Sequence, residues 1–100
     1  MIVKVCYNQG RKIVVIIDSN LVGKKVEENN RQLDLTAEFY KGEETDDEEV
    51  KNIVKGVYIL HIVGRESIAL ALKEGWIDEA NIIQIKGIPH AETMIIENRG

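Results

Sequence analysis

Long hydrophobic runs are missing from this sequence, and their absence excludes a membrane-spanning helix. The longest uninterrupted apolar run lies between Ile13 and Ile17 and is about five residues long, whereas a helix that crosses a bilayer needs roughly 20. The N-terminus, MIVKVCYNQG, has an early charge and neither the apolar core nor the small-residue cleavage site of a signal peptide. We therefore expect a cytoplasmic protein with no membrane partner.

Cysteine and proline are nearly absent too. Cys6 is the only cysteine, so no disulfide can form within the chain and no zinc site can be built from several cysteines. Because Cys6 lies in an apolar segment, we expect a small buried hydrophobic side chain there. Pro89 is the only proline and occurs in GIPHAE, residues 87–92, between two isoleucine-rich runs. Its rigid ring predicts a fixed corner at this point.

The residues that are present have the composition of an ordinary folded domain. The chain has 100 residues, 44% of them hydrophobic and 30% charged, which is typical of one globular domain with one core, here residues 1–100. The net charge is -4, and seven acids but two lysines fall within residues 38–51. This acidic balance opposes unaided binding of nucleic-acid phosphates.

Two hairpins are predicted in the N-terminal third. Segments rich in β-branched residues, at residues 2–7 and 12–18, are separated by NQGR, whose asparagine and glycine favour a turn. A single helical turn ended by Gly23 follows. Two short alternating segments, KKVEE and QLDL, are then joined through NNR, which predicts a second, weaker hairpin.

Two helices are predicted in the second half. TDDE places Thr45 three residues before Glu48, the spacing of a capping box, so the first helix is expected from Asp46 to near Lys55. The segment GRESIALALKEG predicts the second helix, with Gly75 as its stop. The expected buried side of this helix consists of Ile68, Ala69, Ala71 and Leu72.

The remaining strands set the fold class. VYILHIV, residues 57–63, is apolar on both faces and predicts a central strand, while IIQIK and TMIIE predict two more, the last after the proline corner. A strand, a helix and a strand in succession favour a right-handed crossover, with VYILHIV and IIQIK parallel. The predicted fold is α+β or α/β, with a mixed sheet of five to seven strands, N-terminal hairpins, a β-α-β crossover and two main helices.

Four blocks of the sequence together resemble a known family. They are LVGKK, LDLTAEFYKGEETDDEEV, HIVGRESIALALKEGWID and IIQIKGIPHAE, and they are similar to the archaeal domain-of-unknown-function family number four hundred and twenty-four. The resemblance implies a small cytoplasmic archaeal protein with no established enzymatic activity and a link to translation. Typical members would have asparagine where this chain has His61, so the resemblance implies no catalytic imidazole at that position.

VGRES is the strongest local candidate for a binding site, because a predicted strand leads directly into a helix there. Free backbone N–H groups at the helix start and the guanidinium of Arg65, next to Gly64, are suited to a carboxylate or phosphate. Ligands of open α/β sheets gather at the C-terminal ends of strands. We therefore predict that Gly64, Arg65 and His90 share one surface pocket. The further binding candidates are Pro89, Lys24 and Lys25.

The two histidines leave two possibilities open. His61, His90 and a carboxylate could form a metal site of the two-histidine, one-carboxylate type. Alternatively, His61 hydrogen-bonds inside the sheet and His90 caps a turn, which is the interpretation that the sequence favours. The acids from Glu43 to Glu49 lack the ligand spacing of a calcium loop and are explained by a helix start. No metal ligand, cofactor or catalytic residue is therefore predicted.

Two functions follow from these observations. The first is a non-enzymatic accessory protein of the translation apparatus that binds a ribonucleoprotein, with the ribosome or translation factors as partners. It depends on the family resemblance and on the missing catalytic constellation. The alternative is a domain that binds a small molecule or an anion at the C-terminal ends of parallel strands.

Overall fold

A mixed six-stranded sheet dominates the computed structural model of the protein, which describes residues 1–35 and 43–95. The strand order is β5-β1-β2-β6-β8-β7, and β3 and β4 form a separate two-stranded sheet. The strands are β1 (Ile2–Asn8), β2 (Arg11–Ile17), β3 (Lys25–Glu28), β4 (Arg31–Asp34), β5 (Glu43–Glu44), β6 (Ile59–Val63), β7 (Ile83–Ile85) and β8 (Ile88–Met94). The helices are α1 (Asp47–Val54) and α2 (Arg65–Lys73), with short 3-10 turns at η1 (Ser19–Leu21) and η3 (Glu79–Asn81). The fold is α+β, and the predicted mixed sheet with N-terminal hairpins and two helices is confirmed.

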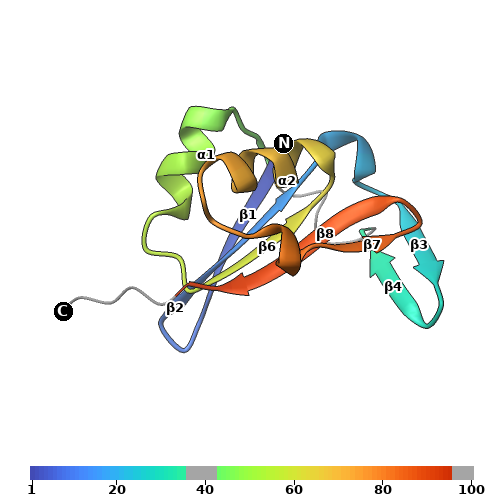
Figure 1. Ribbon diagram of the computed structural model, residues 1–100. Helices are drawn as coiled ribbons and strands as arrows, with labels where there is room; N and C mark the ends of the chain where they lie inside the picture. Colours follow the sequence, from blue (N-terminus) through green and yellow to red (C-terminus); the bar gives the residue numbers. More distant parts are fainter. Residues whose placement is uncertain (36–42, 96–100) are drawn as a thin grey trace.

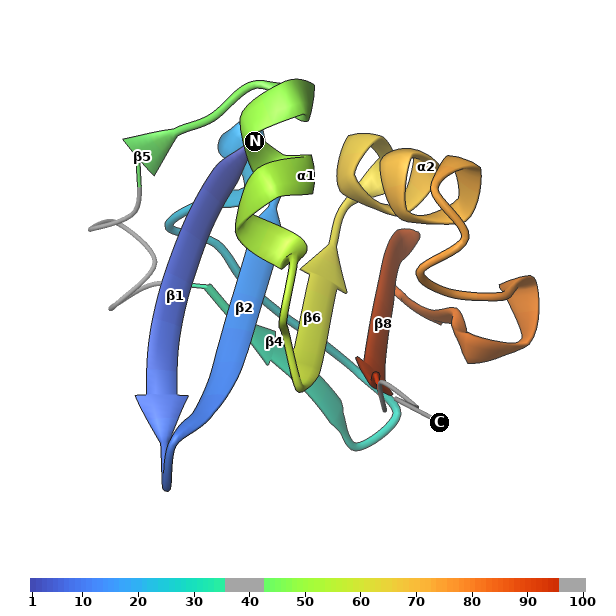
Figure 2. The same ribbon diagram turned by 90° about the vertical axis from the view of Figure 1, so that its left-hand side faces the viewer.

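Both helices pack on the same face of the six-stranded sheet (Figures 1 and 2). Val50 and Val54 of α1 and Ile68 of α2 bury their side chains in the same cluster as the inward-facing residues of the strands. Four of those strand residues, Val14, Ile16, Leu60 and Ile62, have no exposed surface at all. Burial of this apolar surface is the main stabilising contribution to the fold.

Among the described residues, the β3–β4 hairpin covers one end of the opposite face. Ile17, Val63 and Ile85 of the sheet form a second buried cluster there with Leu21 and Leu35. Figure 1 shows the hairpin projecting beside β7, away from the helices. The sheet therefore has helices along one face and a small second core at one end of the other face.

Two-residue turns close the hairpins. Gln9 and Gly10 join β1 to β2, and Asn29 and Asn30 join β3 to β4, with positive φ angles at all four residues. Hairpins of this length favour such turns because their twist matches that of the strands. Both predicted N-terminal hairpins are confirmed.

The predicted parallel direction of VYILHIV and IIQIK is confirmed, because β6 and β7 are both antiparallel to β8, but the two strands are not neighbours in the sheet. Within the described residues, the one parallel ladder joins β2 to β6, with α1 on the connection between them. β7 does not pair with β6, because β8 lies between them and is antiparallel to both. The cause is the two-residue turn at Lys86 and Gly87, both with positive φ, which folds β8 back between β7 and β6.

The proline corner was also misplaced. β8 begins at Ile88, so Pro89 and His90 lie within the strand and the turn is at residues 86–87. Pro89 pairs with Gln84 at a position just beyond the last residue of β6 that pairs with β8. Of the predicted final strand TMIIE, Thr93 and Met94 are the last two residues of β8, Ile95 follows the strand, and residues 96–97 lie outside the described residues.

The start of α1 differs from the prediction by one residue. Asp46, and not Thr45, is the N-cap residue, and its carboxylate accepts a hydrogen bond from the Glu49 backbone N–H at 2.9 Å. The Thr45 hydroxyl donates to the Glu43 carbonyl oxygen instead. TDDEE, residues 45–49, contains two overlapping capping patterns, and the carboxylate of Asp46 occupies the cap. The predicted end of the helix near Lys55 is confirmed.

Two further side-chain expectations were wrong. In α2, Ser67 and Leu70 are buried along with Ile68 and Ala71, whereas Ala69 is exposed. Cys6 is exposed as well, since it lies near the turn of the β1–β2 hairpin on the face of the sheet opposite α1 and α2. No helix in residues 1–35 or 43–95 is long and apolar enough to cross a membrane, and the cytoplasmic location stays a prediction.

Candidate functional site

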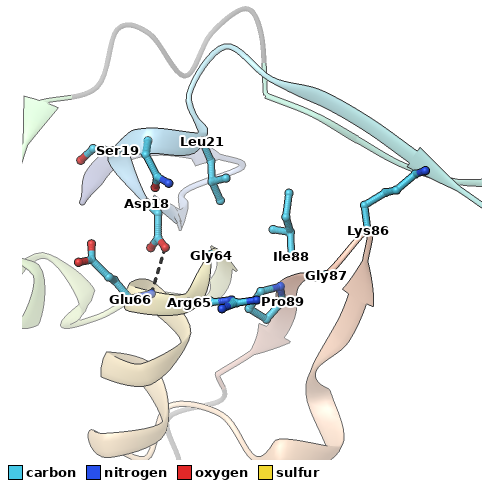
Figure 3. Close-up of a pocket in the computed structure, with 11 residues that line it drawn as sticks. Asp18, Ser19, Leu21, Gly64, Arg65, Glu66, Lys86, Gly87, Ile88 and Pro89 are labelled. Carbon is cyan, nitrogen blue, oxygen red and sulfur yellow. Dashed lines mark hydrogen bonds between the residues drawn. The ribbon is translucent and has the colours of Figure 1, made fainter.

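A pocket of about 630 Å³ lies at the carboxyl ends of the two parallel strands. Three segments line it: residues 18–21, which follow β2, residues 64–66, which follow β6, and residues 86–89 at the β7–β8 turn (Figure 3). Gly64, Arg65 and Pro89 were predicted to be site residues, and the structure brings all three to this pocket. Its position also matches the rule that ligands of sheets with parallel strands bind beyond the carboxyl ends.

Asp18 occupies the N-terminus of α2. Asp18 as a residue is 5% exposed. Its carboxylate accepts hydrogen bonds from the Glu66 N–H at 3.0 Å, the Ser67 N–H at 2.8 Å and the Ser67 hydroxyl at 2.7 Å. A carboxylate there satisfies helix N–H groups that lack a partner within the helix and interacts favourably with the helix dipole. The expected free N–H groups of residues 66 and 67 are therefore already used within the chain.

Gly64 allows this close approach of Asp18. Its φ is +107°, and a Cβ at this position would lie 2.2 Å from the Asp18 Cγ. The Gly64 N–H donates to the Pro89 carbonyl oxygen at 2.8 Å, so the chain leaving β6 is tied to β8 before α2 begins. Any other residue would meet both an unfavourable backbone angle and a steric clash.

The pocket combines charged and apolar side chains. Arg65 and Glu66 extend from the start of α2 in opposite directions (Figure 3), and Lys86 adds a second cation. Leu21, Ile88 and Pro89 supply apolar surface. The helix N–H groups compensate the negative charge of Asp18. Among the other lining residues, the two cations, Arg65 and Lys86, outnumber the one carboxylate, Glu66.

The hairpin that carries Lys86 is itself held in place. The Lys86 N–H donates to the Glu28 carboxylate at 3.0 Å, which ties the β7–β8 turn to the end of β3. On the other side of the pocket, the Ser19 hydroxyl donates to Glu44, which also pairs with the N-terminal ammonium group. The two ends of the pocket wall are thus anchored by hydrogen bonds to neighbouring elements.

His90 was expected in this pocket, and the structure places it elsewhere. Its backbone is near, because His90 pairs with Val63, the residue before Gly64, but its side chain does not line the pocket. The Nε2 atom of His90 lies 2.8 Å from the Nε2 atom of His61 on the neighbouring strand. The contact between the two histidines depends on the register of the strands, because alternate residues of a strand point to opposite faces of the sheet.

The two imidazoles form a half-buried pair on the face of the sheet opposite the helices. Burial lowers the pKa of His61, and the Glu92 carboxylate opposes this effect. Burial also lowers the pKa of His90, with a further contribution from His61, again opposed by Glu92. Both rings are therefore easier to keep neutral than a free histidine.

One tautomer suits the pair best. The Nδ1 atom of His90 is buried and has no hydrogen-bond partner among the described residues. A buried N–H without a partner is less favourable than a buried lone pair without one. We therefore assign the proton of His90 to Nε2, which donates to the lone pair on the Nε2 atom of His61.

Lys24 and Lys25 are not part of the pocket. Both are exposed and lie at the start of β3, outside the three lining segments. Lys86, which was not among the predicted binding residues, is the second cation of the pocket besides Arg65. Asp18 was also missed, although its position directly after a β-branched strand is a signal for a residue at a strand end.

Fold and pocket define a class of protein: a small α+β domain with a mixed sheet and an open pocket at the carboxyl ends of a parallel strand pair. Within that class, the chain belongs to the family described as a protein of unknown function, DUF424, which matches residues 7–96. This confirms the resemblance seen in the sequence blocks.

A solved structure has the same fold. The crystal structure of an uncharacterized conserved protein from Methanopyrus kandleri is similar with a TM-score of 0.80 and 16% sequence identity. The similarity covers 99% of this chain and 94% of that one. Comparison with curated proteins gives no match.

Proposed function

We propose that this protein binds a small organic anion in the pocket at the carboxyl ends of β2 and β6. The observation that carries the proposal is that Arg65 and Lys86, from different elements, both line one pocket with an apolar wall, with the Lys86 side chain extending away from Arg65 in Figure 3. A guanidinium offers a planar fork of donors that suits a carboxylate, and an ammonium adds a point charge. The apolar wall favours a ligand that also has a hydrocarbon part.

The capped start of α2 narrows the ligand class. Phosphates usually bind at helix N-termini through backbone N–H groups, but Asp18 already accepts from residues 66 and 67. A carboxylate held by the side chains of Arg65 and Lys86 avoids competition with Asp18. We therefore expect a carboxylic acid of small size to bind better than inorganic phosphate.

Nuclear magnetic resonance titration tests this proposal. Hexanoate, a carboxylate with an apolar tail, should shift the backbone amide signals of residues 18–21, 64–66 and 86–88, and inorganic phosphate should shift them less. Arg65→Gln and Lys86→Gln should each weaken hexanoate binding while changing the free energy of unfolding by less than about 0.5 kcal/mol.

Lys25→Gln is the matched control, because Lys25 is an exposed lysine outside the pocket. Its hexanoate affinity should equal that of the unchanged protein. Amide shifts spread over the whole surface, or an equal loss of affinity in all three variants, would contradict a defined site in this pocket.

Association with the ribosome or with translation factors stays a prediction that depends on the family resemblance. Tagged protein should co-sediment with ribosomal particles at low salt and leave them as the salt concentration rises, if basic residues contribute to the contact. Sedimentation as a free chain of 11.3 kDa at low salt would contradict it.

A further inference from the structure

His61 and His90 come from adjacent strands in the middle of the six-stranded sheet, and neither lines the pocket described above. Their Nε2 atoms are 2.8 Å apart, and the rings are 4.9 Å apart between centroids with a tilt of 50°. Strands β6 and β8 are paired over five residues of each, from Ile59 to Val63 and from His90 to Met94. Two imidazole nitrogens are thus held close together by a rigid part of the fold.

We propose that His61 and His90, together with Glu92, form a binding site for a divalent ion of the first transition series. Imidazole nitrogen is a favoured ligand of zinc, nickel, copper and iron ions, and a set of two histidines and one carboxylate leaves positions open for water or substrate. The three residues lie on one face of the sheet, because Glu92 pairs with His61 and is two residues from His90 along β8.

The spacing of the two nitrogens is close to what coordination requires. With bonds of about 2.0–2.1 Å to zinc, two nitrogens lie roughly 2.9 Å apart at a right angle and roughly 3.3 Å apart at the tetrahedral angle. The observed separation of 2.8 Å is therefore near the lower value. The rings point at one another end to end, so each must turn toward solvent to aim its lone pair at a shared ion.

Glu92 is placed to supply the third ligand. It is exposed and directly opposite His61 in the register of β6 and β8, where Cβ atoms of paired residues are about 4.5–5.5 Å apart. In residues 1–35 and 43–95, no three side chains of His, Cys, Asp or Glu are already grouped as metal ligands. The proposal therefore requires the Glu92 side chain to change rotamer when the ion binds, which exposure allows.

The buried Nδ1 of His90 limits the strength of the site. When an ion occupies Nε2 of a neutral imidazole, the proton resides on Nδ1, and histidine ligands normally donate that proton to a partner. The Nδ1 atom of His90 is buried without such a partner among the described residues. We therefore expect zinc binding in the micromolar range and not the much tighter binding of a structural zinc site.

Zinc titration of the full chain tests the proposal. The protein carries Cys6→Ser, because the exposed Cys6 thiol is a competing ligand, and is first stripped with a chelator. Calorimetry should show one zinc ion bound per chain. Nitrogen-15 spectra of the imidazole rings should show that zinc shifts the signals of both His61 and His90, a readout that needs no substitution in the site.

Substitutions then identify the ligands. His61→Asn and His90→Gln should each lower the zinc affinity by at least about tenfold, since loss of an outer partner of a ligand already has an effect of that size. Glu92→Gln should also lower it, whereas Glu79→Gln, an exposed glutamate on η3, should leave it unchanged.

Two results would overturn the proposal. One is a zinc affinity of folded His61→Asn or His90→Gln protein that equals the affinity of the Cys6→Ser protein with both histidines in place. The other is the absence of imidazole shifts in the unsubstituted site, which decides the matter even if both variants fail to fold. Equal effects of Glu92→Gln and Glu79→Gln would remove Glu92 from the site.

Discussion

At the scale of single residues, Asp18 and Gly64 depend on each other. The carboxylate of Asp18 is buried and can remain so because the N-terminus of α2 supplies three hydrogen bonds to it. A buried charge without such partners would destabilise the fold strongly. Gly64 leaves the space that the carboxylate fills. The pocket is therefore built on a structural contact that leaves Arg65 exposed beside it.

Gly64→Ala should be strongly destabilising for two reasons that act together. The backbone angle disfavours alanine, and the new methyl group would overlap Asp18, so we expect a loss of about 2–4 kcal/mol in the free energy of unfolding. Gly75→Ala is the matched control, with a φ of +76° and no atom within 4 Å of an added Cβ, and should lose about 1 kcal/mol. Denaturant unfolding measures both, and equal losses would show that the Asp18 contact is unimportant.

The histidine pair predicts a dependence of stability on pH in metal-free buffer. Burial lowers the pKa of both imidazoles in the folded state, while the unfolded chain has the ordinary value of about 6.5. The unfolded state therefore binds more protons below that pH, and stability is lost as the pH falls from about 7 through the lowered folded values.

Comparison with His61→Asn isolates this contribution. Unfolding in denaturant at several pH values, with a chelator present, should show a smaller loss of stability between pH 7 and 5 for His61→Asn than for the unchanged protein. The substitution removes one titrating imidazole and also the neighbouring charge that opposes protonation of His90. Identical pH profiles would contradict the lowered pKa of His61.

At the scale of elements, the N-terminus of α1 shows which of two adjacent residues, Thr45 and Asp46, caps the helix. Three acids, Asp47, Glu48 and Glu49, fill its first turn, where negative charge interacts favourably with the helix dipole. Its apolar side is fixed by Val50 and Val54, which are buried against the sheet. The acidic run thus has a structural explanation in the described part of α1.

Asp46→Ala should destabilise the protein by about 1 kcal/mol through the lost cap. Thr45→Ala should have a smaller effect, because the Thr45 hydroxyl bonds a carbonyl outside the helix. The free energy of unfolding of the two variants, measured side by side, checks the order. A larger loss for Thr45→Ala would mean that the helix begins one residue earlier.

At the scale of the whole molecule, stability is distributed unevenly. β2 and β6 are adjacent in the middle of the six-stranded sheet, paired on both edges and buried against the helices. The β3–β4 hairpin has one ladder of four residue pairs, and its residues are mostly exposed. Opening the hairpin exposes far less apolar surface than separating the central strands.

Hydrogen exchange should reveal this difference. The hydrogen-bonded amides of β2 and β6 should exchange only through global unfolding, with a strong dependence on denaturant, whereas those of β3 and β4 should exchange faster through local opening. Exchange rates followed by nuclear magnetic resonance at increasing denaturant would measure both. Equal protection of hairpin and central strands would indicate that the protein opens as one unit.

The sequence by itself determined the local elements of this protein. The β-branched runs and turn residues specified the hairpins, the apolar spacing specified both helices, and VYILHIV was recognised as a central strand. These features depend on neighbours within a few residues, so the pattern contains the needed information. VGRES was predicted as a strand-to-helix junction for the same reason, because that pattern also depends only on neighbouring residues.

Only the tertiary structure decided which distant residues meet. The position of β8 between β6 and β7 moved the His90 side chain out of the predicted pocket and onto His61. The parallel pairing of β2 with β6 brought Asp18 to α2, 49 residues from Ser67 in sequence. Strand order and register depend on long-range pairing, and a shift of one residue exchanges the faces of a strand. The local sequence pattern does not specify strand order, because the same strands can be paired in several orders with their apolar faces equally well buried.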